Sequence, residues 1–126
     1  MSQENSTLAQ LSRDVFNLFG MWHIDPKDQI VLLGLPENIR PRSLNSYRTQ
    51  TKTLPDDAPT IERMESFIEM HGALLHAFPH NERLANYWIT TKSGFFNDMR
   101  PLDVMLNSGI DGIRYVLNHL TQSEVW

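Results

Sequence analysis

Residues 57–79 read DAPTIERMESFIEMHGALLHAFP, and this stretch decides the fold class. Its apolar residues recur at spacings of three and four, which is typical of one face of an α-helix. That face consists of Ile61, Met64, Phe67, Ile68, His71, Leu74, Leu75 and Phe78. Pro59 favours a first helical turn and Pro79 prevents continuation. The stretch therefore predicts one long amphipathic helix that begins at residues 57–60 and ends near Phe78.

The rest of the chain repeats the helical pattern over shorter segments. Helices are predicted over about 6–22, 26–33, from Pro41 onward, 82–90, 101–106 and 111–120. Residues 49–58 hold Leu54 as their only large apolar residue and are predicted to form a linker. No segment alternates like a strand. We therefore expect an all-α protein of about seven helices. Its two small lobes, 1–54 and 55–126, either share one core or are joined by the long helix.

Composition excludes several classes of protein. The 126 residues are 40% hydrophobic and 21% charged, which is enough apolar material for a core and argues against general disorder. The absence of cysteine excludes disulfides, thiol catalysis, cysteine-ligated zinc and iron–sulfur clusters. No apolar run approaches 18 residues, and the first residues lack a signal-peptide pattern. We expect a soluble, cytoplasmic protein without a membrane partner.

Charge is distributed unevenly along the chain. Residues 1–54 carry six basic and five acidic side chains, a net charge of +1, whereas residues 55–126 carry five basic and ten acidic ones, a net charge of −5. Residues 37–52 alone are net +3. This asymmetry indicates either two surfaces with different partners or chance clustering on a solvated face.

The basic island coincides with a candidate helix-turn-helix, because Gly34 separates two short predicted helices. Recognition of DNA needs cations for phosphates and short polar side chains for base edges. The candidate DNA-binding residues are Arg40, Arg42, Ser43, Asn45, Ser46, Arg48 and Lys52. A plain helical hairpin with a polar outer face is the alternative.

The second half carries a more specific pattern. A tryptophan segment, Trp88-Ile89-Thr90-Thr91, precedes the loop Gly94-Phe95-Phe96-Asn97 and the segment from Arg100-Pro101-Leu102-Asp103 to Gly109. The final segment, from Gly112 to Leu120, has the form Gly-x-x-x-Val-x-x-x-Leu. Together with Leu32-Leu33-Gly34-Leu35 and Glu62-Arg63-Met64, these motifs resemble the Xre/MbcA/ParS antitoxin family over residues 15–120. Asp98 stands where members often have glycine. Residues 37–39 make the turn between the two short helices a few residues longer than is usual in that family.

The resemblance implies an antitoxin of a type II toxin–antitoxin system, with a helix-turn-helix lobe followed by a toxin-binding lobe. The implied partners are a RES-domain toxin that consumes NAD, operator DNA through which the operon is autorepressed, and a second copy of the chain in a homodimer. The candidate toxin-binding residues are Phe95, Phe96, Asn97, Arg100, Asp103 and Trp126. The alternative is a stand-alone protein-binding module of the same fold whose helix-turn-helix no longer binds DNA.

Enzyme patterns are not apparent. The histidines at 71, 76 and 80 are poorly spaced for a metal pair on one helix face. The chain has no Gly-x-Gly-x-x-Gly, P-loop or Gly-x-Ser-x-Gly motif. We expect no catalytic residue, cofactor or metal.

Overall fold

The computed structural model describes residues 3–122 of the chain, with side chains from residue 8 onward. This part is built from helices and loops, and an isolated bridge joins Ser93 and Met99. The elements are α1 (Gln3–Met21), α2 (Pro26–Leu32), η1 (Pro41–Ser43), α3 (Leu44–Arg48), α4 (Ala58–Ala77), α5 (Glu82–Tyr87), η2 (Trp88–Thr90), η3 (Gly94–Phe96) and α6 (Pro101–Gln122). The expected all-α class is confirmed.

Helix boundaries follow local chemistry. The Asp57 carboxylate accepts a 2.8 Å hydrogen bond from the backbone N–H of Thr60 and caps α4. At the end of α2, Gly34 has φ +71°, and the N–H of Leu35 donates to the carbonyl of Ile30 at 3.1 Å. This is the glycine-dependent C-terminal motif expected from the sequence. Prolines 26, 41, 59 and 101 lie in the first turns of their helices.

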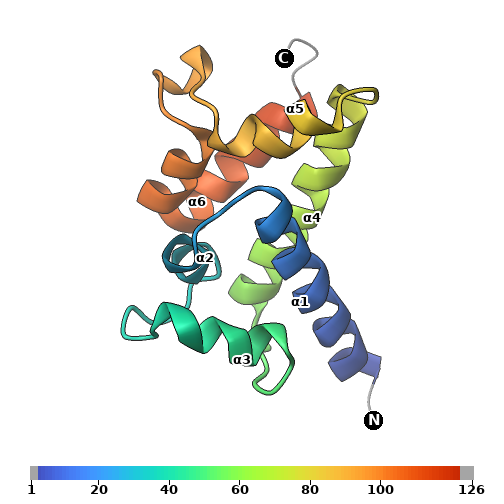
Figure 1. Cartoon of the computed structure of the whole chain (residues 1–126), viewed down its shortest axis with the longest axis vertical. Coiled ribbons are helices and arrows are strands. Elements are labelled where there is room, and N and C mark those ends of the chain that lie inside the picture. Colours follow the sequence, from blue (N-terminus) through green and yellow to red (C-terminus); the bar gives the residue numbers. More distant parts are fainter. Residues whose placement is uncertain (1–2, 123–126) are drawn as a thin grey trace.

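Helix α4 is the centre of the molecule and packs against both α1 and α6, while α2 packs against α6 (Figure 1). The buried side chains form one cluster that includes residues from both sides of residue 54. Phe19 of α1 and Phe67 of α4 meet edge to face, with ring centroids 5.2 Å apart. Leu54, in the predicted linker, is only 2% exposed and fastens that connection to the core.

The apolar face predicted for α4 needs correction. Met64, Phe67 and Leu74 are fully buried as expected, but Leu75 is 43% exposed. Met70, which the predicted face omits, is fully buried. Because α4 is covered from two sides by α1 and α6, its buried surface is broader than a single stripe and is rotated away from Leu75.

The two predicted C-terminal helices are one element, α6, which is kinked at Gly109. The backbone there has φ +59° and ψ −138°, a conformation that is essentially restricted to glycine. Beyond the kink, Gly112 lies against the preceding turns. A Cβ at Gly112 would overlap the carbonyl oxygen of Val104 and would lie 3.1 Å from the Cα of Met105. The two halves of α6 therefore pack closely because residue 112 has no side chain.

Candidate functional site

The loop between η2 and α6 is held in a tight conformation. The N–H of Ser93 donates to the Met99 carbonyl at 3.1 Å, and the N–H of Asp98 donates to the Ser93 carbonyl at 2.9 Å. Asn97 and Asp98 both have left-handed backbones, with φ +57° and +64°. Asparagine and aspartate tolerate this conformation better than most residues. The positive φ of Asp98 gives a physical reason for the glycine that resembling sequences carry at this position.

The loop separates its two phenylalanines. Phe96 is 4% exposed and packs edge to face with Trp88, with ring centroids 6.2 Å apart. Phe95 is 54% exposed. Of these two predicted toxin contacts, the structure therefore places Phe95 on the surface and Phe96 in the core.

Two residues of α6 complete an aromatic surface around Phe95. The His119 ring stacks on Phe95 at 3.8 Å between centroids, and the Tyr115 ring lies 6.1 Å from Phe95 with 25° between the planes. Tyr115 is 53% exposed. Burial lowers the pKa of His119 from its usual 6.5. We call Phe95, Tyr115 and His119 the aromatic platform. Tyr115 and His119 are not among the predicted toxin contacts, although their i, i+4 spacing places them on one helix face.

Arg100 and Asp103, two further predicted toxin contacts, bind each other. The Arg100 guanidinium donates to both carboxylate oxygens of Asp103, at 3.0 and 2.7 Å, and the Arg100 backbone N–H donates to Asp103 at 3.1 Å. This pair fixes the start of α6 and holds the pKa of Asp103 below its usual 3.8. Asn97 is exposed beside it, and Trp126 lies outside the described residues.

A second apolar area lies on α5. Leu84 is 51% and Tyr87 is 42% exposed, beside a shallow hollow of about 340 Å³ that Asn81, Arg83 and Thr91 also line. The His23 ring stacks on Tyr87 with centroids 4.8 Å apart.

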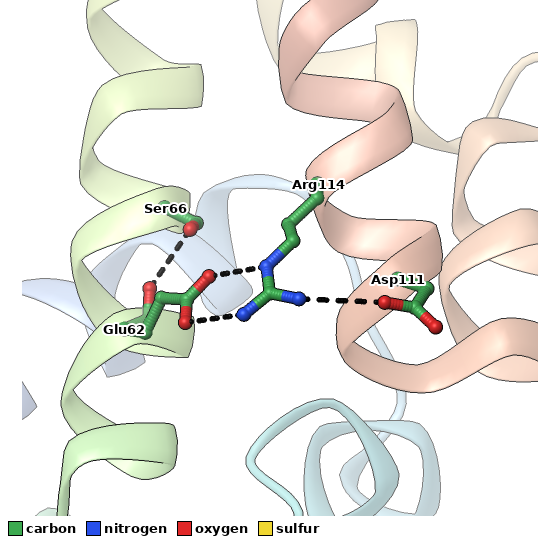
Figure 2. A network of polar contacts seen from close by, with 4 residues as sticks. All are labelled: Glu62, Ser66, Asp111 and Arg114. Carbon is green, nitrogen blue, oxygen red and sulfur yellow. Dashed lines mark hydrogen bonds and ion pairs between the residues drawn. The ribbon is translucent and has the colours of Figure 1, made fainter.

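An acidic groove of about 430 Å³ is lined by side chains of α4 and α6. Figure 2 shows Arg114 of α6 bridging to Glu62 of α4, with nitrogen–oxygen distances of 2.6 and 2.7 Å, and approaching Asp111 at 3.4 Å. The guanidinium lowers the pKa of the Glu62 carboxyl. Glu65 and Glu69 line the same groove.

The predicted DNA-binding residues lie at the far end of the molecule. In Figure 1, η1 and α3 lie at the bottom, and the loop that carries Phe95 lies at the top. The four cations of this segment are exposed and form no ion pair with any residue of 8–122: Arg40, Arg42, Arg48 and Lys52. Asn45 is also exposed, whereas Ser43 and Ser46 are half-buried. We call residues 40–52 the basic segment.

Comparison with known families identifies the second half of the chain. Residues 73–124 match the family described as antitoxin Xre/MbcA/ParS C-terminal toxin-binding domain. This match supports the Xre/MbcA/ParS family over residues 73–124. No curated protein and no solved structure matches it significantly.

The matched range contains the aromatic platform, the α5 area and the Arg100–Asp103 pair, and it excludes the basic segment. Among residues 8–122, six large hydrophobic side chains are exposed. Five of them, Leu75, Leu84, Tyr87, Phe95 and Tyr115, lie within the toxin-binding domain, and Val31 lies outside it. Across the described part of the chain, no helix combines the length and hydropathy needed to cross a membrane.

Proposed function

We propose that this antitoxin neutralises a RES-domain, NAD-consuming toxin by binding it through the surface of residues 73–124 and covering its active site. The observation that carries the proposal is the concentration of exposed apolar side chains in this range. Exposed apolar side chains that lie together, as Phe95 and Tyr115 do, are a common sign of a protein–protein interaction site. The excess of acidic residues in this half complements a basic nucleotide-binding cleft, which favours rapid association.

Co-expression tests this role. The reading frame beside the gene is expressed from an inducible promoter, with and without this chain, and cell growth and cellular NAD are measured. We expect NAD depletion and growth arrest that the chain reverses, and we expect the two proteins to co-purify. Unchanged growth and NAD in the absence of the chain, or no rescue in its presence, contradicts the proposal.

We further propose that the basic segment binds operator DNA and that a homodimer of the antitoxin represses its own operon. Support comes from four exposed cations without an ion-pair partner among residues 8–122. The stretch 41–48 is helical, and a helix with its side chains is about 10–12 Å across, which fits a B-DNA major groove about 12 Å wide. Its position at the opposite end from the loop of residues 94–96 leaves room for both partners (Figure 1).

Gel-shift assays with the upstream DNA test the second role. A dimer that neutralises about six to eight phosphates should give a log–log salt slope of about −5 to −7. Arg42→Ala and Arg48→Ala should weaken binding and flatten that slope. Arg13→Ala, which removes an exposed cation of α1, is the matched control and should change little.

The outcomes of that assay distinguish two functions. Absence of binding at low salt, even with the toxin present, favours a protein-binding module whose helix-turn-helix has lost DNA recognition. Sedimentation of the purified chain, alone and with DNA, tests the homodimer.

A further inference from the structure

We propose that the aromatic platform is the anchor of the toxin interface, and that it enters an apolar pocket rimmed by basic side chains on the toxin. The inference rests on the proposed antitoxin function and specifies which part of the matched surface supplies the binding energy. Phe95 is its central residue, and Tyr115 and His119 support it.

The Phe95 ring is exposed and yet held in place by its neighbours. On one side its ring meets buried Phe96 edge to face, with centroids 5.0 Å apart and planes at 89°. On the other side it stacks on His119. Its backbone N–H donates to the Ser93 hydroxyl at 3.3 Å. An exposed ring that is already fixed loses little rotamer freedom when it is buried by a partner, so more of the burial energy appears as affinity.

The three rings of the aromatic platform are nearly parallel. The Phe95 plane makes an angle of 27° with the His119 plane and 25° with the Tyr115 plane, so the rings together form an aromatic surface. Aromatic side chains in such clusters dominate the energetics of protein interfaces. Leu84, the more exposed of the two apolar side chains of the α5 area, has no aromatic ring to stack on a partner.

Acidic side chains near the platform indicate which charges the rim of the partner's pocket carries. Asp98 is exposed three residues after Phe95 in the same tight loop. Asp111 has an 84% exposed side chain and lies one helical turn before Tyr115 on α6. Asp98 and Asp111 thus flank residues of the platform along the chain, and Asp111 also lies 3.4 Å from Arg114. Acidic groups near an apolar centre match a pocket whose rim carries Lys or Arg, as an anionic-nucleotide site does.

Isothermal titration calorimetry or surface plasmon resonance measures the affinity for the toxin that the neighbouring reading frame encodes. The toxin is purified as an inactive variant. Phe95→Ala should weaken binding roughly 30-fold or more, the size typical of hot-spot truncation. Tyr115→Ala should weaken it about tenfold. Phe95→Trp keeps a large ring and should restore most of the affinity. Leu84→Ala removes an equally exposed apolar side chain of the same domain and should change affinity less than about threefold.

Folding is checked separately by thermal unfolding of each variant, because a loss of binding counts only where the melting temperature is retained. Phe95→Trp tests the anchor role in a variant that retains a large aromatic side chain at this position. The anchor role of the platform is refuted if Phe95→Ala binds the toxin as tightly as the wild type, or if Leu84→Ala weakens binding as much as Phe95→Ala does. Either result leaves the antitoxin role intact. Absence of wild-type binding overturns both.

Discussion

Replacing Gly112 by alanine adds a methyl group where the two halves of α6 meet. That Cβ would overlap the Val104 carbonyl oxygen and would lie 3.0 Å from the Cβ of Ser108. The first of these neighbours is backbone, which no change of side-chain rotamer relieves. The two halves of α6 must therefore separate, and the core around Met105 and Val116 loosens.

The size of the effect follows from two opposing terms. Overpacking a closed contact costs about 1–3 kcal/mol, with larger values for rigid neighbours. The better helix propensity of alanine returns up to about 1 kcal/mol. We expect a net loss of about 2 kcal/mol. With an unfolding entropy of about 2.1 cal/mol/K per residue, this lowers the melting temperature by about 8 °C.

The matched control is Gly72→Ala in α4. Gly72 is exposed and helical, and a Cβ there would meet no atom within 4 Å. Only the propensity gain remains, so Gly72→Ala should raise the melting temperature by up to about 4 °C. Scanning calorimetry compares the two variants with the wild type. A Gly112→Ala protein that melts at or above the wild-type temperature refutes the close contact within α6.

Three further changes test other parts of the C-terminal domain. Phe96→Ala should reduce the free energy of unfolding by about 3–5 kcal/mol in urea titrations, since Phe96 is buried; a loss below 1 kcal/mol contradicts its core position. The lowered folded pKa of Asp103 gives the wild type stability that is complete above pH 3.8 and is lost as the pH falls through the folded pKa. Asp103→Asn should lack this contribution, so plots of unfolding free energy against pH for the two proteins should converge in acid. Burial lowers the pKa of His119 below 6.5, so the unfolded chain binds this proton more readily and stability is full above pH 6.5 and declines below it. His119→Gln should lose less stability than wild type between pH 7.5 and 5.5; an equal loss in both speaks against the buried neutral ring.

Much of the fold could be predicted because its boundaries are encoded locally. Pro26, Gly34 and Pro101 each set a helix end through their own backbone restrictions, and the break in α6 falls at Gly109 between the two helices that the sequence predicts. The depth of Leu54 and Met70 was not predictable in this way, because it depends on which helices cover them.

The candidate site shows the same limit. The sequence singles out Phe95 and Phe96 together, but only the turn created by left-handed Asn97 and Asp98 sends one ring inward and the other outward. Contacts between distant segments were also invisible. The Arg63 guanidinium packs so closely against Gly34 that a Cβ at residue 34 would overlap the guanidinium. No local sequence pattern predicts this contact.

Helices from before residue 54 are fastened to helices after it, α1 to α4 and α2 to α6, around one shared core. A cut in the connection at residues 49–57 therefore divides the helices of one cooperative unit and does not release two independent domains. We expect neither fragment to persist alone, so a cellular protease that traps the unfolded chain removes both recognition surfaces together. In the proposed role, release of the toxin and release of the operator would then share a single rate constant, set by global unfolding.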